Sequence, residues 1–236
     1  LNASCKVYGI NLIVNKSNYK LEKQLQLCLQ YKVPFIITSL CNPEKVIHAC
    51  RPLRIKVFCD VSNLEFAEKA AKSNPDALIA VLDNAGGHHG KLSAEEFIPL
   101  LVQHFPHIPI ISAGGVGDYQ GIQKMLALGA CGVSIGSIFI ASEESDVSDE
   151  YKNACVQYGA SDIVSTTKLS GVPCTVIQTQ YVKNLGTKEN WIEKFLNRNK
   201  RFKKWLKMIV YQRGMKQLEK AAFSASYKKI WCAGPT

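Results

Sequence analysis

Two adjacent histidines follow an apolar run in DALIAVLDNAGGHHGKL, the stretch that spans residues 76–92. Gly86 and Gly87 precede the histidines, and Gly90 follows them. Histidine titrates near neutrality and can take a proton from a weak carbon acid, so an imidazole here is a candidate general base. The glycines would let the backbone pass close to a flat ligand. The alternative interpretation is a loop histidine that is exposed to water and has no catalytic role.

His88 and His89 do not form a pattern that predicts a metal site. Successive side chains of an extended segment point to opposite sides, so the two imidazoles would not converge on one ion. No cysteine or carboxylate stands nearby at the spacing of a metal ligand, and a histidine pair is not a zinc pattern. The sequence therefore predicts one working imidazole in this loop and no metal.

Glycines and hydroxyls also follow two later apolar runs, in SAGGVGD (112–118) and GVSIGS (132–137). Glycine admits positive φ and brings backbone N–H groups close to a ligand, and a helix beginning near Asp118 would add a favourable site for an anion such as phosphate. Ordinary turn glycines explain either motif taken alone. Two such motifs in consecutive repeats favour a phosphate site.

Short apolar runs alternate with amphipathic segments, and these elements would position the histidine loop and the two glycine-rich segments. Such alternation predicts βα units around a parallel sheet, with ligands beyond the C-terminal ends of the strands. About six units are present, which fits an open doubly wound sheet or a (β/α)8 TIM barrel lacking about its first two strands. No GxGxxG motif follows the first run, which weakens the dinucleotide-binding alternative. The predicted strands are 8–14, 33–39, 55–61, 76–82, 108–113 and 131–137, and the predicted helices are 20–31, 42–52, 64–73, 94–105 and 118–128.

The alternation stops after residue 140. We predict a helix at 149–159, extended chain at 162–179 and a long helical stretch at 190–223. This favours a partial barrel domain over 1–142 and a small, mainly helical C-terminal domain over 143–236 that returns to the barrel.

Charge is concentrated near the C-terminus. Of the net charge of +10, residues 183–236 contribute 14 Lys+Arg against 3 Asp+Glu, so the remainder is nearly neutral and carries no signature of nucleic-acid binding. The basic amphipathic stretch 188–208 fits a helix that covers the barrel. The alternative is a surface that contacts a membrane or an acidic carrier protein.

The nine cysteines include no CxxC pair, which argues against a disulfide framework or a zinc ribbon and favours unpaired thiols in a reducing cytoplasm. No stretch approaches the roughly 18 apolar residues of a membrane span. We therefore expect a cytoplasmic protein without a membrane segment.

In this order, DALIAVLDNAGGHHG, IPIISAGGVGD and GVSIGSIFIAS resemble the nitronate monooxygenases, formerly 2-nitropropane dioxygenases, which are FMN-dependent (β/α)8 barrels. EYKNACVQYGASDIVSTTKLSGVPCTVIQT and WCAGP are similar to one branch of that family, so the resemblance covers roughly residues 8–236. The flavin enoyl-acyl-carrier-protein reductases share the barrel and a similar AGGH stretch. Family members begin with a glycine-rich strand segment that this sequence lacks, so we expect the N-terminal end of the barrel to be missing.

The resemblance implies a role for each matching residue. His88 would be the catalytic base, Gly87 would lie near the flavin, and His89 would have no role. Many relatives carry an acidic residue where this chain has Asn84, a change that removes a charge able to raise the pKa of the histidine. The residues implied to hold the FMN phosphate are Gly114, Gly115, Gly117, Ser134, Ile135, Gly136 and Ser137.

The implied activity is oxidation of alkyl nitronates or nitroalkanes by O2 to a carbonyl compound and nitrite, with FMN as cofactor. The alternatives are an FMN-dependent oxidoreductase like the enoyl-acyl-carrier-protein reductases, or an inactive, truncated protein that only binds FMN or another phosphate ligand. The expected partners are a nitronate or nitroalkane and O2, and a homodimer is the candidate oligomer.

Overall fold

The computed structural model describes residues 7–15, 18–39, 42–168, 172–191, 195 and 230–235. Its contacts define two compact units, of which the first comprises 1–83 and 90–134 and the second comprises 84–89 and 135–236. The chain therefore passes between the units at 83/84, 89/90 and 134/135. The division into domains at 142/143 stays a prediction. The long helix expected at 190–223 and the basic stretch 188–208 lie largely outside the described residues.

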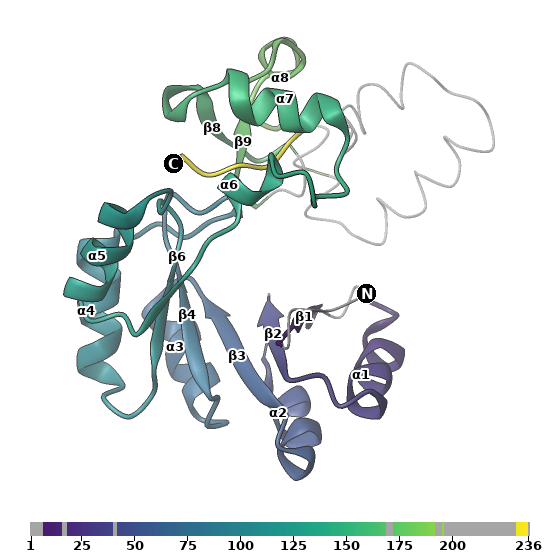
Figure 1. The fold of residues 1–236 in the computed structure, drawn as a ribbon, viewed down its shortest axis with the longest axis vertical. Coiled ribbons are helices and arrows are strands. Elements are labelled where there is room, and N and C mark those ends of the chain that lie inside the picture. Colours follow the sequence, from purple (N-terminus) through teal and green to yellow (C-terminus); the bar gives the residue numbers. More distant parts are fainter. Residues whose placement is uncertain are drawn as a thin grey trace. The chain divides into compact units, whose positions relative to one another are not determined.

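A six-stranded parallel sheet forms the centre of the first unit (Figure 1). Its strands pair in sequence order, β1-β2-β3-β4-β6-β7, without a reversal. A doubly wound sheet reverses its strand order at a switch point, whereas a barrel does not. The order therefore confirms the barrel-type prediction, and all six predicted strands are present. They are β1 (Gly9–Ile13), β2 (Phe35–Ser39), β3 (Lys56–Val61), β4 (Ala77–Val81), β6 (Ile110–Ala113) and β7 (Gly132–Ser134).

Five α-helices connect these strands and confirm the predicted helical segments. Side-chain caps begin three of them: Asn63 accepts a hydrogen bond from Phe66 N (2.8 Å), Asp118 accepts one from Gly121 N (2.7 Å), and Ser93 begins a capping box. The five helices are α1 (Leu21–Gln30), α2 (Glu44–Cys50), α3 (Leu64–Ala71), α4 (Ala94–His104) and α5 (Tyr119–Ala127), and a 3₁₀ turn, η1 (Arg51–Leu53), follows α2.

The two faces of the parallel sheet differ in burial. On one face, strand residues such as Ile36 and Leu78 are buried, as are Phe97 and Leu101 on the apolar side of α4. Side chains alternate along a strand, so the positions between them face the other side, which is the interior of a barrel. In β2 and β3 these interior positions are half-buried: Phe35, Ile37, Ser39, Phe58 and Asp60.

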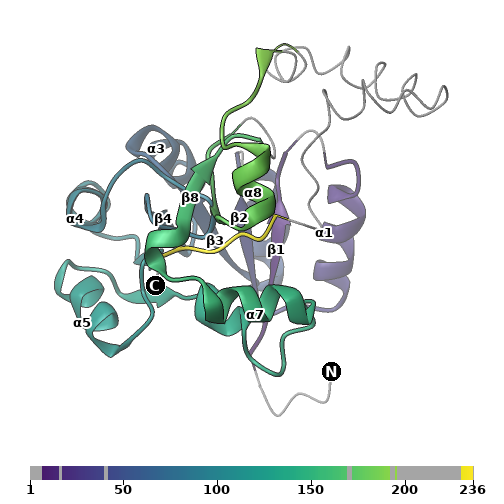
Figure 2. The ribbon, with the colours of Figure 1, turned by 90° about the horizontal axis from the view of Figure 1, so that it is seen from above.

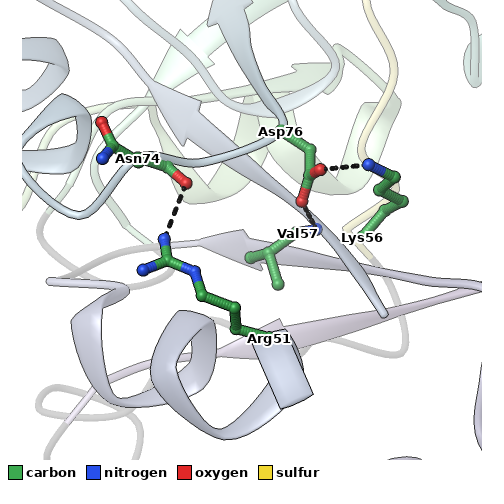
Figure 3. A network of polar contacts seen from close by, with 5 residues as sticks. All are labelled: Arg51, Lys56, Val57, Asn74 and Asp76. Carbon is green, nitrogen blue, oxygen red and sulfur yellow. Dashed lines mark hydrogen bonds and ion pairs between the residues drawn. The ribbon is translucent and has the colours of Figure 1, made fainter. Parts of the chain in front are cut away.

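A polar network fixes the N-terminal ends of β3 and β4 (Figure 3). Asp76 accepts hydrogen bonds from Val57 N (2.9 Å) and from Lys56 Nζ (2.6 Å), and Arg51 donates to the carbonyl of Asn74 (3.4 Å). These residues also line a cavity of about 340 Å³. Because ligands of such sheets bind at the opposite, C-terminal ends of the strands, we interpret this network as structural.

The second unit contains a small antiparallel sheet of order β5-β9-β8, formed by β5 (Gly87–His88), β9 (Cys174–Ile177) and β8 (Ile163–Thr166). The segment 230–235, yellow in Figure 2, lies beside this sheet, and Ile177 N donates to Trp231 O (2.9 Å). Among the described residues of this unit, the helices are α6 (Ser137–Ile140), α7 (Asp149–Gln157) and α8 (Gln180–Leu185), with a 3₁₀ turn, η2 (Ala160–Asp162). Helix α7 confirms the predicted helix at 149–159, and β8 and β9 confirm the predicted extended chain over the described residues of 162–179. Within the described ranges, every helix is too short or too polar to cross a membrane.

Candidate functional site

The loop that carries the histidines leaves the C-terminal end of β4 and returns close to it. Asp83 N donates to Leu92 O (3.0 Å), and Gly90 N donates to Leu82 O (2.9 Å). A Cβ atom at Gly90 would overlap the carbonyl oxygen of Val81, so this position requires glycine. The base of the loop is therefore held on the first unit, while residues 84–89 belong to the second.

Strand β9 holds the tip of this loop. Gly87 pairs with Thr175 and His88 pairs with Cys174 in an antiparallel register. The buried hydroxyl of Thr175 donates to Ala85 O (2.5 Å) and lies 3.3 Å from Gly87 O. Gly87 has φ of 79°, a conformation that favours glycine. The backbone that carries His88 is thus fixed by a strand nearly 90 residues away in the sequence.

Gly86 has a different role from the one predicted. A Cβ atom there would lie 2.9 Å from Gly234 N and 3.2 Å from Ser137 Oγ, and one at Gly234 would lie 2.6 Å from Asn84 O. The space that was expected to admit a flat ligand is filled at Gly86 by the chain's own C-terminal segment. At Gly87, by contrast, an added Cβ would approach only Cys232 Cβ, at 4.0 Å.

The two histidines have different surroundings. His89 Nε2 lies 2.9 Å from Ser165 Oγ on β8, whereas His88 is exposed on β5. Partial desolvation of the ring, together with the neighbouring His89, lowers the pKa of His88 from its ordinary value of 6.5. The imidazole of His88 is therefore neutral at neutral pH, the state in which it can accept a proton.

The two glycine-rich junctions start from neighbouring strand ends. Ala113 at the end of β6 pairs with Ser134 at the end of β7, so the segments that begin at Gly114 and Ile135 leave adjacent positions. Gly114 and Gly115 have positive φ values of 124° and 65° and lead to α5, a helix of nine residues. This combination of glycines and a helix N-terminus suits an anion.

The predicted phosphate residues are divided between the units. Gly114, Gly115, Gly117 and Ser134 belong to the first unit, whereas Ile135, Gly136 and Ser137 belong to the second, as do Gly87 and His88. Ser137 Oγ accepts a hydrogen bond from Gly234 N (2.9 Å), which leaves its hydroxyl proton available for donation. A Cβ at Gly136 would meet no atom of the described residues within 4 Å.

Two observations fit a flavin ligand, one at the predicted phosphate residues and one at Asn84. The glycine at 136 is not required by local packing, so its space is open to a ligand that approaches the backbone closely. The side-chain oxygen of Asn84 is buried and has no hydrogen-bond partner among the described residues, so an N–H group of a ligand would satisfy it. The residues present are therefore compatible with FMN.

Sequence reasoning missed a polar cluster on the interior side of β1–β3. Ser39 Oγ donates to Asp60 Oδ2 (2.5 Å) and lies 3.0 Å from Asn11 Oδ1. Burial raises the pKa of Asp60 above its ordinary 3.8, although the Ser39 hydrogen bond opposes this shift. A polar residue near the end of the apolar run 55–61 was the available signal, because the C-terminal ends of barrel strands carry functional groups.

Comparisons with known proteins converge on one family. The family model described as nitronate monooxygenase matches residues 5–227. A probable nitronate monooxygenase of Staphylococcus saprophyticus is 30% identical over 172 residues, covering 68% of this chain and 48% of its own length. An octahydroindene carboxyl-CoA dehydrogenase of Rhodococcus jostii is 27% identical over 180 residues, covering 76% of this chain and 50% of its own length.

Solved structures extend the likeness to the fold. FabK from Thermotoga maritima superposes with a TM-score of 0.75 at 26% identity, covering 98% of this chain and 69% of that protein. The chain spans about half the length of the two curated relatives.

Proposed function

Because the chain belongs to the nitronate monooxygenase family, we propose that it oxidises alkyl nitronates or nitroalkanes with O2 to a carbonyl compound and nitrite. The observation that carries this proposal is the position of three loops with residues suited to ligand binding. They follow the C-terminal ends of β4, β6 and β7 in one parallel sheet. In barrels, this end of the strands is where ligands bind and react. A cytoplasmic location and a homodimer remain predictions from the sequence.

We propose that FMN is the cofactor and that its phosphate binds at the β6 and β7 junctions. Backbone N–H groups of Gly114, Gly115 and Gly117 would donate to the phosphate, together with the N-terminus of α5. Ser134, Ile135, Gly136 and Ser137 would complete this cradle, and Gly87 would lie near the flavin ring. FMN supplies the electron acceptor of the oxidation when it is bound.

His88 would act as the base towards a neutral nitroalkane. A ring nitrogen of the neutral imidazole accepts the α-proton from carbon, and the substrate becomes its nitronate. A substrate supplied as the preformed nitronate needs no such step. The lowered pKa of His88 supports this role because it keeps the imidazole unprotonated at neutral pH.

The second candidate is an FMN-dependent oxidoreductase of thioesters, similar to the enoyl-acyl-carrier-protein reductases. The named carboxyl-CoA dehydrogenase matches the chain at nearly the same identity as the probable nitronate monooxygenase does. Both candidates use the same barrel and cofactor, so the substrate distinguishes them. An FMN-binding protein without activity is the third alternative.

Anaerobic spectroscopy of the flavin-loaded protein separates these alternatives. We expect the flavin absorbance to bleach on addition of an alkyl nitronate and to return, with release of nitrite, when O2 is admitted. Bleaching by NADH, with no response to nitronate, would instead favour the thioester reductase. A protein that binds flavin but responds to neither donor would be the inactive binder. Comparing FMN with riboflavin tests the phosphate site, because only FMN offers the phosphate to the glycine junctions.

A further inference from the structure

Two cysteines that are distant in sequence lie next to each other in the second unit. Cys174 on β9 and Cys232 in the C-terminal segment have their sulfur atoms 3.6 Å apart, although 58 positions separate them in the chain. A disulfide bond requires about 2 Å, so a small side-chain rotation would bring the two atoms to bonding distance. Both cysteines are free thiols in this structure.

Several contacts hold Cys232 in place opposite Cys174. Trp231 O accepts a hydrogen bond from Ile177 N (2.9 Å), and the ring of Trp231 stacks on Tyr151 at 5.7 Å between centroids. The hydroxyl of Tyr151 donates to the carbonyl of Cys232. Trp231 and Cys232 are thus anchored to β9 and α7, and the approach of the two thiols follows from the packing of the second unit.

The two thiols differ in exposure and in acidity. Cys174 is 2% exposed, whereas Cys232 is half-buried and can be reached by a small oxidant. The contact between the two sulfur atoms lowers the pKa of Cys232 and raises the pKa of Cys174. The thiolate is the nucleophile in thiol oxidation. Cys232 is therefore the thiol that reacts first with an oxidant, and Cys174 is the thiol that can form a disulfide with it.

We propose that Cys232 and Cys174 form a peroxide-sensitive thiol pair, a modification site separate from the proposed oxidation of nitronates. Cys232 Sγ attacks one oxygen of hydrogen peroxide, the O–O bond breaks, and Cys232 becomes a sulfenic acid with release of water. Cys174 Sγ then attacks Cys232 Sγ, the S–O bond breaks, and the hydroxyl leaves as a second water. Two thiols and one peroxide thus yield one disulfide and two waters.

The bond would fasten the C-terminal segment to the strand that holds the histidine loop. Cys174 is the register partner of His88, and a Cβ atom added at Gly87 would lie 4.0 Å from Cys232 Cβ. Closing a loop of this length restricts the unfolded chain and stabilises the folded state. Oxidation should therefore raise the melting temperature and slow amide exchange at 230–235.

The test uses the full chain at neutral pH with hydrogen peroxide added in stepwise amounts. After blocking and proteolysis, mass spectrometry should find the Cys174 peptide linked to the Cys232 peptide, and dithiothreitol should separate them. The Cys174→Ser variant should instead accumulate a sulfenic acid at Cys232 that reacts with dimedone. The Cys131→Ser variant, which removes an exposed thiol of the first unit, should leave the cross-link unchanged.

Labelling of the unmodified protein provides a second measurement that needs no variant. A limited amount of iodoacetamide should alkylate Cys232 several-fold faster than the half-buried Cys155, and peroxide should protect Cys174 and Cys232 together. Equal alkylation of Cys232 and Cys155, or a disulfide that joins either member of the pair to a different cysteine, would overturn the proposal. Neither readout depends on flavin or on turnover, so failure of the proposed function leaves this test intact.

Discussion

The hydroxyl of Thr175 donates a hydrogen bond of 2.5 Å to the carbonyl of Ala85, a residue that precedes it by 90 positions. Both residues are buried, and the bond fixes the loop just before the first glycine of the AGGHH stretch. The position of His88 therefore depends on β9, a strand that is distant from it in the sequence.

Replacing Thr175 by Val should cost about 1–3 kcal/mol of stability, because the buried carbonyl of Ala85 loses its donor while the side-chain volume is kept. Thr166→Val is the matched control, since the buried hydroxyl of Thr166 donates to Thr187 O (2.9 Å) outside the histidine loop. Urea unfolding should show similar losses for both variants. Turnover of nitroalkane should fall only for Thr175→Val, and an equal fall in both would contradict a specific role in positioning.

Replacing Gly86 by Ala should loosen the C-terminal segment, because the new methyl group would lie 2.9 Å from Gly234 N. Overpacking of this kind typically costs about 1–3 kcal/mol. Gly159→Ala is the control, since a Cβ there meets no atom within 4 Å in the part of the chain that the structure describes, and its φ is negative. Thermal melting should separate the two variants, with faster amide exchange at 230–235 only for Gly86→Ala. Identical melting temperatures would argue against the backbone packing at Gly86.

The pH dependence of nitroalkane oxidation should report the ionisation of His88. Protonation removes its ability to accept the α-proton, so the rate should fall as pH decreases through a pKa below 6.5. His88→Gln should lower the rate with neutral nitroalkane by about 10²–10⁴-fold and leave oxidation of the preformed nitronate nearly unchanged. His107→Gln, at an exposed site of the first unit, serves as the control. An acidic limb that persists in His88→Gln would assign the base elsewhere.

Asp60 should make the protein less stable as pH rises. Its folded-state pKa is raised, mainly by burial, so the folded chain keeps this proton at pH values where the unfolded chain has lost it. Stability therefore falls from about the ordinary pKa of 3.8 up to the folded-state value and stays lower above it. Asp60→Asn should match the original protein in acid and melt higher at neutral pH, whereas exposed Glu68→Gln should not. A melting difference that is constant with pH would refute this assignment.

Local patterns were sufficient to predict the parallel sheet. The run 76–82, for example, is almost continuously apolar, and the structure places β4 at Ala77–Val81 with its first four residues buried. Both faces of such a strand are covered by other elements, so its residues are almost all apolar. The helix that begins at Asp118 could be predicted equally well, because an N-cap residue is recognisable in the local sequence.

The contacts of the second unit had no such local signal. Strand β5 has two residues, and only its pairing with β9 identifies it as a strand. The sequence predicts room for a ligand at Gly86, but a sequence cannot distinguish a ligand from the chain's own backbone at Gly234. The position of Asp60 near the end of an apolar run marks it as a candidate, but its burial and its contact with Ser39 depend on the register of β2 and β3.

The pairing of β5 with β9 has a consequence for the order of folding. Each strand of the parallel sheet pairs with the strand of that sheet that follows it in the sequence, so the sheet can grow from the N-terminal side as the polypeptide lengthens. The short strand at Gly87–His88 must wait for Cys174–Ile177 to emerge from the ribosome. During synthesis, residues 84–89 would thus be made well before β9, the strand that fixes their backbone, and the histidine loop would be among the last segments to reach its native conformation.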